Sequence, residues 1–101
     1  MTQPELYFIS GSPPCWSVML ALEVKGIAYE PRRLDNAKRE QKSPEYLKIS
    51  PRGQVPVLVD DGTTVRETLA VLSYLDAQYA EPPLFGQTPV ETARIWQAIC
   101  E

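Results

Sequence analysis

The chain of 101 residues has room for one domain and little more. Apolar residues make up 44% of it and charged residues 23%, which is typical of a soluble globular fold, and no apolar run approaches the ~18 residues that a bilayer requires. A formal charge of −3, only two cysteines and no histidine exclude a strongly basic nucleic-acid surface, a zinc cluster of the usual ligands and every catalytic pair that needs an imidazole.

The first third of the chain predicts a strand, a helix and a second strand. Residues 6–9 are apolar with aromatic and branched side chains, as in a buried strand. Residues 15–25 are expected to form the helix, with Ser12 as its cap, two prolines in its first turn and Gly26 at its end. Residues 27–34 alternate loosely and follow as a strand, so we expect a right-handed parallel crossover.

Seven of the ten cations lie between residues 30 and 52, a segment that carries +3 in a chain whose remainder carries −6. One short helix at most is expected there, over residues 43–49, with Ser43 as cap and Pro44 at its first position. Two interpretations of the charge remain open. The segment is either a solvated connection or a basic rim that steers a small anion to the protein.

A hairpin and a helix complete the predicted sheet domain. Two short apolar segments, 57–59 and 63–65, flank an Asp-Asp-Gly sequence, which is a strong signal for a tight turn. The helix over residues 68–79 is amphipathic. Its apolar side carries Leu69, Leu72, Leu75 and Tyr79. The order βαβ, short helix, ββα predicts an α/β fold with a mixed four-stranded sheet and helices on its faces.

We expect residues 1–80 to form this domain, 81–87 to be a linker, and 88–101 to be the first helix of an all-helical C-terminal domain that is truncated or absent. Thr88, Pro89 and Glu91 make a capping box for that helix. Its apolar side chains, which need a partner, are Val90, Ile95, Trp96 and Ile99. Either the helix folds back on the sheet domain or its partner helices are missing, and we favour the second interpretation.

The first motif with chemical potential is Ser12-Pro13-Pro14-Cys15, at the predicted start of a helix. A helix N-terminus carries about half a positive charge and free N–H donors, so a thiolate there is stabilised, and the Ser12 hydroxyl adds a donor. In the structural alternative, Ser12 caps the helix with its own oxygen and Cys15 packs as a small apolar residue.

Two further motifs stand at predicted element ends. A cis bond between Val55 and Pro56 would turn the N–H and C=O of Val55 outward, where an extended peptide pairs with them, whereas a trans bond would only protect a sheet edge. At the start of the next helix, Thr68 as cap would hold a ligand carboxylate and Glu67 an ammonium group. The ordinary alternative is an acid near the positive end of a helix.

In this order, the motifs resemble the N-terminal, thioredoxin-like domain of cytosolic glutathione transferases, in the serine or cysteine branch that includes zeta, theta, omega and bacterial forms. The likeness runs unbroken over residues 7–79. It is carried by residues 12–15, 21–30, 43–47, 50–58 and 67–68. The resemblance implies a thioredoxin-like fold with glutathione as co-substrate, and no metal.

The resemblance also implies a role for each site residue. Ser12 falls where the family's serine donates a hydrogen bond to the glutathione thiolate, and Val55, before a cis Pro56, falls where the backbone pairs with the cysteinyl unit. Glu67 and Thr68 fall where the γ-glutamyl ammonium and carboxylate are held; the family usually has serine in place of Thr68, so the hydroxyl is retained. Three more positions fall near the tripeptide, the last two near its glycyl carboxylate: Gln54, Gln41 and Lys42.

The leading hypothesis is a glutathione transferase that stabilises the glutathione thiolate for attack on a small electrophile. A second is a non-catalytic scaffold or regulatory protein of the same fold. A third is a glutaredoxin-like thiol oxidoreductase with Cys15 as its redox thiol, which the serine at the first thiol position weakens. No nucleic-acid or membrane partner is expected, and dimers are usual in the family, which makes a homodimer an option. The N-terminus has no basic start followed by an apolar stretch, so we expect a cytoplasmic protein.

Overall fold

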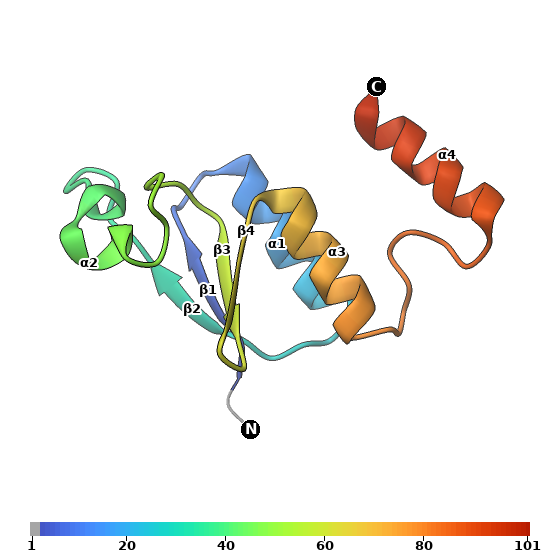
Figure 1. Ribbon diagram of the computed structural model, residues 1–101, viewed down its shortest axis with the longest axis horizontal. Helices are drawn as coiled ribbons and strands as arrows, with labels where there is room; N and C mark the ends of the chain where they lie inside the picture. Colours follow the sequence, from blue (N-terminus) through green and yellow to red (C-terminus); the bar gives the residue numbers. More distant parts are fainter. Residues whose placement is uncertain (1–2) are drawn as a thin grey trace.

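The computed structural model describes residues 3–101, in which four strands form one mixed sheet (Figure 1). The strands are β1 (Glu5–Phe8), β2 (Glu30–Arg33), β3 (Val57–Asp60) and β4 (Thr63–Arg66), in the order β2-β1-β3-β4. β1 and β2 are parallel, whereas β3 is antiparallel to both β1 and β4. The predicted mixed four-stranded sheet is confirmed. The expectation that the N-terminus carries no secretory signal includes Met1 and Thr2, which lie outside the described residues.

Two helices cover one face of this sheet, and a shorter one lies on the other side (Figure 1). The pair is α1 (Pro13–Val24) and α3 (Thr68–Gln78), and the short helix is α2 (Pro44–Leu47). Leu6 and Leu58 stand opposite each other on the two central strands and are fully buried. The core that joins sheet and helices consists of Leu6, Val18, Ala21, Leu22, Leu58, Val71 and Leu75. Each large apolar side chain buried here contributes roughly 1.5–3 kcal/mol, so this layer supplies much of the driving force for folding.

The predicted apolar side of the last core helix is wrong at one position. Leu69 is 44% exposed, whereas Val71 is fully buried. At about 100° per residue, Leu69 and Val71 flank the stripe of Leu72, Leu75 and Tyr79 on opposite sides, and the side of Val71 is the one turned to the core. The three residues of the stripe do pack in or against the core, so the buried face is rotated toward Val71 rather than inverted.

The second strand is also shorter than the predicted 27–34, because only Glu30–Arg33 pairs with the sheet. All four of its residues are exposed, as on an edge strand. The N–H of Ile27 instead donates to the carbonyl of Leu22 at 2.9 Å and closes the end of α1. The residues before Glu30 therefore form the connection between helix and strand.

The cation-rich segment contains two short helices, not the single one predicted. A 3-10 turn, η1 (Glu40–Lys42), precedes α2. Local carboxylates build the approach to it: Glu40 Oε1 accepts the N–H of Asp35 at 2.6 Å, and Asp35 Oδ1 accepts that of Ala37 at 2.9 Å. Such side-chain-to-backbone bonds form turns without any apolar period, so the sequence pattern gave no sign of this one.

The last helix, α4 (Pro89–Cys100), stands apart from the sheet and its two covering helices (Figure 1). It has no buried residue in the described chain, so it does not fold back. Its cap is as predicted, since Thr88 Oγ1 accepts the N–H of Glu91 at 3.1 Å. The Glu91 carboxylate, however, accepts the N–H of Gln87 at 2.8 Å rather than that of the cap residue.

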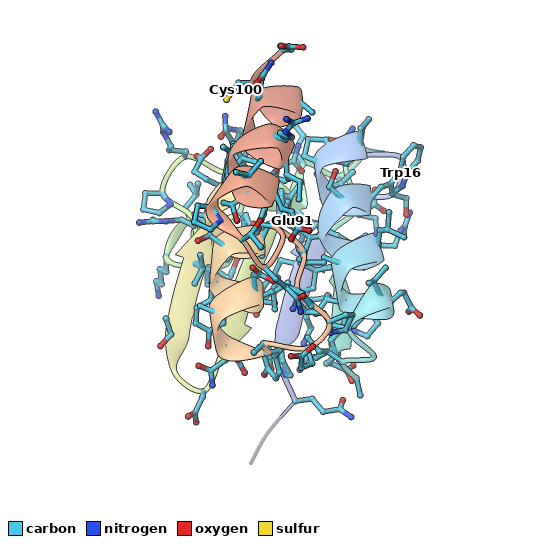
Figure 2. The ribbon with its side chains drawn as sticks, turned by 90° about the vertical axis from the view of Figure 1, so that its right-hand side faces the viewer. Trp16, Glu91 and Cys100 are labelled. Atoms are coloured by element: carbon cyan, nitrogen blue, oxygen red, sulfur yellow. The ribbon has the colours of Figure 1, made fainter. Side chains whose placement is uncertain are left out.

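An apolar stripe also remains exposed on α1, formed by Trp16, Leu20 and Val24 at successive turns. Figure 2 shows Trp16 pointing away from the neighbouring α3. Over residues 3–101, no helix combines the length and the hydropathy that crossing a bilayer demands.

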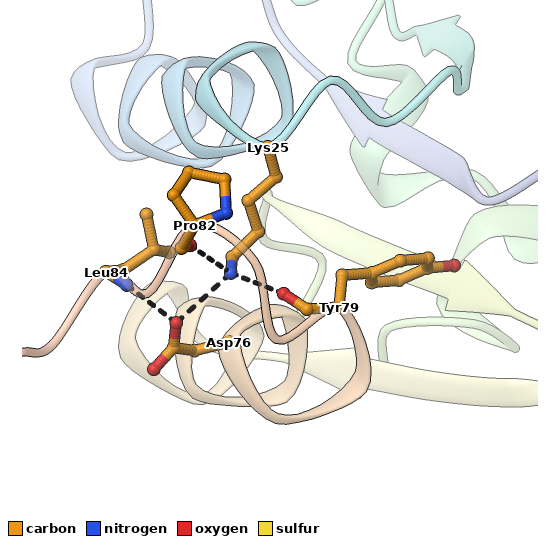
Figure 3. A network of polar contacts seen from close by, with 5 residues as sticks. All are labelled: Lys25, Asp76, Tyr79, Pro82 and Leu84. Atoms are coloured by element: carbon orange, nitrogen blue, oxygen red, sulfur yellow. Dashed lines mark hydrogen bonds and ion pairs between the residues drawn. The ribbon is translucent and has the colours of Figure 1, made fainter. Parts of the chain in front are cut away.

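A buried lysine ties the ends of α1 and α3 to the segment that follows them (Figure 3). The side chain of Lys25 is fully buried, and its ammonium donates to the carbonyls of Tyr79 and Pro82, the latter at 2.7 Å. It also lies 3.2 Å from Asp76 Oδ1, which in turn accepts the N–H of Leu84 at 2.7 Å. One cation therefore satisfies three acceptors and fixes the chain between α3 and α4.

Replacing Lys25 by Met should lower the free energy of unfolding by about 2–4 kcal/mol, because the change leaves a partly buried carboxylate and two carbonyls without their donor. Urea denaturation measures this directly. Lys48→Met is the matched control: Lys48 is exposed, and the described chain shows no polar partner for it, so the change should stay within about 0.5 kcal/mol. Equal effects of the two variants would contradict the role assigned to Lys25.

Candidate functional site

A groove of about 960 Å³ opens where the loop before β3, the strand β4 and the first turn of α3 meet. Five of the predicted site residues line it: Gln54, Val55, Pro56, Glu67 and Thr68. Pro14, from the first turn of α1, also lines it. Segments more than 50 residues apart in the sequence therefore share one concave surface.

The loop before β3 is held in place from behind. The Tyr46 hydroxyl donates to the carbonyl of Gln54 at 2.7 Å, and Ser50 Oγ donates to the same carbonyl at 3.2 Å. The peptide bond between Val55 and Pro56 is cis. Because β3 begins at Val57, no backbone group of the described chain pairs with the N–H or the C=O of Val55. This residue leaves a free donor and acceptor at the groove.

Gly53 is required by the close approach of this loop to the 3-10 turn. Its φ is +64°, and a Cβ there would lie 2.8 Å from the carbonyl oxygen of Gln41 and from Lys42 Nζ. Lys42 Nζ donates to the carbonyl of Arg52 at 3.1 Å, and Gln41 Nε2 donates to Asn36 Oδ1 at 2.7 Å. Lys42 therefore supports the loop from outside the groove, whereas the side chain of Gln41 bonds within the cation-rich segment, and neither residue lines the groove.

The first turn of α3 faces the groove without a side-chain cap. The prediction that Thr68 caps this helix is wrong: the cap position is Glu67, with φ at +78°, and Thr68 is the first helical residue. Glu67 makes no capping bond, so the N–H groups of residues 68–70 have no partner in the described chain. By contrast, the hydroxyls of Ser43 and Thr88 cap α2 and α4, which do not reach the groove. Three backbone donors and a hydroxyl are thus available to a carboxylate.

The first turn of α1 is also uncapped, but it offers fewer donors. Ser12 occupies the cap position as predicted, yet its hydroxyl makes no capping bond, which removes the purely structural interpretation of this serine. Pro13 and Pro14 have no N–H, so Cys15 supplies the only unpaired backbone donor of this turn in the described chain. Ser12 stands two residues before the lining residue Pro14 and does not itself line the groove.

Cys15 is completely buried in the core side of α1. A thiol that attacks a disulfide must be reached by it, so this burial contradicts the redox role suggested for Cys15. The alternative interpretation, a small apolar residue in the core, is the correct one.

The charges at the groove include two arginines that the motif analysis did not assign to the site, Arg52 and Arg66. Arg52 Nη1 lies 3.4 Å from Glu67 Oε2, and both side chains are largely exposed. With one acid and two guanidinium groups, the lining carries a net positive charge in an acidic protein. The cation-rich segment was the available signal: its last member reaches the groove, as a basic rim would.

The chain matches a family model described as the N-terminal domain of glutathione S-transferase over residues 6–83. It is 38% identical over 94 residues to Glutathione S-transferase 1 of Dianthus caryophyllus, which covers 93% of this chain and 42% of that protein. A glutathione S-transferase structure from the Antarctic clam Laternula elliptica superposes with a TM-score of 0.90 at 41% identity, over 95% of this chain and 44% of the other. A glutathione transferase homologue from Sulfitobacter, with bound glutathione, gives 0.90 at 36%, over 99% and 48%. The chain spans less than half the length of these relatives.

The Tyr46 hydroxyl, which holds the loop before β3, makes the stability of the fold depend on pH in the alkaline range. Burial raises the pKa of Tyr46 to about 12, with the nearby Ser50 hydroxyl offsetting part of the rise. A phenol whose pKa is higher in the folded than in the unfolded state stabilises the fold fully below pH ~10, the unfolded value, and loses that contribution as the pH rises toward 12.

We therefore expect the free energy of unfolding to fall between pH 10 and 12, and Tyr46→Phe to remove part of that fall while costing about 1 kcal/mol at neutral pH through the lost bond to Gln54. The rest of the fall remains, because burial and the bond to Asp60 also raise the pKa of Tyr74 to about 12. Urea denaturation across this pH range measures both effects. Tyr7→Phe is the matched control, because the Tyr7 ring packs against Tyr46 at 5.6 Å but no hydrogen bond of its hydroxyl is seen. A steep alkaline fall unchanged in Tyr46→Phe would refute the assignment.

Proposed function

The chain belongs to the glutathione S-transferase family, whose N-terminal domain it matches, and from this premise we propose that it binds glutathione in the groove and stabilises the thiolate for attack on a small electrophile. The observation that carries the proposal is the pairing of two free backbone features on one surface: the unpaired N–H and C=O of Val55 and the uncapped first turn of α3. Both are what a peptide with a terminal carboxylate needs.

Binding begins with an extended tripeptide beside the loop before β3. The cysteinyl unit pairs with the N–H and C=O of Val55, as an added strand does. The α-carboxylate of the γ-glutamyl end accepts bonds from the N–H groups of the first turn of α3 and from the Thr68 hydroxyl. Glu67 takes the ammonium group. The positive groove favours glutathione, which carries a net negative charge at neutral pH.

The chemical step uses the start of α1. The Ser12 hydroxyl and the N–H of Cys15 donate to the thiolate, whose proton is released to water, and the helix dipole adds to the stabilisation. The thiolate then attacks the electrophilic carbon of the second substrate and forms the carbon–sulfur bond. At a saturated or aromatic carbon the bond to the leaving group breaks and that group departs with the electron pair. At an activated double bond the π pair moves to the electron-withdrawing group, which then takes a proton from water. Ser12 acts as a hydrogen-bond donor and forms no covalent bond itself.

Ser12→Ala should raise the pKa of the bound glutathione thiol by roughly one to two pH units, because a hydrogen bond to a charged group is worth roughly 1.5–3 kcal/mol. Thiolate absorbance of the complex, followed against pH, measures it. Glutathione affinity should change little at a pH where the bound thiol is protonated. Ser73→Ala, at an exposed position of α3, is the control and should leave the titration unchanged. A titration curve that Ser12→Ala does not move would contradict the donor role.

Thr68→Val keeps the shape of the side chain but removes the hydroxyl. Glutathione should bind roughly 3- to 10-fold more weakly, because one charge-assisted bond to the carboxylate is lost while the backbone donors remain. Isothermal titration with glutathione gives the ratio. An affinity equal to that of the unmodified protein would place the carboxylate elsewhere.

A further inference from the structure

Arg52 combines a fixed backbone with a free side chain at the mouth of the groove. Its carbonyl accepts from Lys42 Nζ at 3.1 Å, and the next residue, Gly53, donates its N–H to the carbonyl of Ser50 at 2.8 Å. The side chain itself is 77% exposed and touches a single acid, Glu67, at 3.4 Å. The loop therefore fixes the backbone of Arg52 and leaves its guanidinium exposed at the groove, in contact with Glu67.

The geometry points to Arg52 as a specificity-determining residue: it binds the α-carboxylate of a ligand's amino-acid end, exchanging its ion pair with Glu67 for a pair with the ligand. This inference rests on the proposed function, since it assumes that the γ-glutamyl end lies at the start of α3. It names the recognised group as a free α-amino acid, with both its ammonium and its carboxylate.

The exchange is favourable because the existing ion pair is weak. Both partners are largely exposed and the contact is 3.4 Å long, so the pair contributes little to stability. A zwitterionic ligand brings both complementary charges: its ammonium pairs with Glu67 and its carboxylate pairs with Arg52. An arrangement of four alternating charges then replaces the single ion pair between Arg52 and Glu67. A carboxylate has two oxygens, so the guanidinium and the N–H donors of α3 bind it together.

The other cations near the groove are less suited to this role. Lys42 already donates to the carbonyl of Arg52 and lies behind the loop. Arg66 lies on β4 and lines the groove, but the described chain shows no ion pair between its side chain and that of Glu67. Arg52 is thus the lining cation that contacts the ammonium-binding acid.

The test compares Arg52→Gln with Arg94→Gln, the same change on an exposed position of α4 away from the groove. Each variant and the unmodified protein are titrated calorimetrically with glutathione and with γ-aminobutyryl-cysteinyl-glycine, which keeps the amine and lacks the α-carboxylate. Arg52→Gln should weaken glutathione binding roughly 3- to 10-fold. The analogue should bind this variant as tightly as the unmodified protein or more tightly, because Glu67 is released from its partner.

Each outcome decides the inference. Equal weakening of both ligands by Arg52→Gln, or glutathione affinity within about 2-fold of the unmodified protein, overturns the role of Arg52. If Arg94→Gln weakened binding as much as Arg52→Gln, the effect would come from the net charge of the protein and not from the position of Arg52, which overturns the inference as well. The proposed function fails separately, if the unmodified protein does not bind glutathione at millimolar concentration.

Discussion

The carbonyl of Gln54 anchors the loop that forms one wall of the groove. It accepts from both the Tyr46 hydroxyl and Ser50 Oγ, on the buried side of the loop before β3. Because this carbonyl is turned inward, the following residue, Val55, is free of the sheet and faces the groove. Tyr46 comes from α2, a helix of four residues that has no other evident function, so this short helix acts as the support of the loop.

The distribution of helix caps follows the same logic. The helices away from the groove, α2 and α4, are closed by Ser43 and Thr88, each worth about 1 kcal/mol. The two whose first turns approach the groove are left open, although both have a polar residue at the cap position, Ser12 and Glu67. Capping stability is thus absent at the two helix ends where the proposed ligand would use the backbone donors, and present at the other two. Glu67 adds a backbone at φ +78°, which a non-glycine residue adopts only under constraint.

Local chemistry explains which parts of the fold could be predicted. The Asp-Gly turn, the Ser43 and Thr88 caps and the strands around Leu6 and Leu58 depend on neighbours a few residues away, so the sequence pattern indicates them. The choice of Val71 over Leu69 as a core residue depends on how α3 is rotated against the sheet, because the two residues flank the same apolar stripe and periodicity alone does not choose between them. The contact of Arg52 with Glu67 spans 15 residues and that of Lys25 with Pro82 spans 57, and no short-range rule contains either. Val55 and Thr68 were predicted to share one site from the family resemblance, not from the hydrophobic or capping pattern of the sequence.

The positively charged groove and the buried ammonium of Lys25 lie at opposite ends of the helix pair α1 and α3. Pro14 and Thr68, both in first turns, line the groove, whereas Lys25 and Tyr79 meet at the last turns, so α1 and α3 run in the same direction. Two parallel helices place two positive dipole ends at the groove and two negative ends around the ammonium of Lys25. An anion at one end and a buried cation at the other are therefore stabilised by the same arrangement. The direction of the helices follows from β4 being parallel to β1 through their common partner β3. It favours an anion at the groove, as the proposed function requires, and a cation, Lys25, at the segment leading to α4.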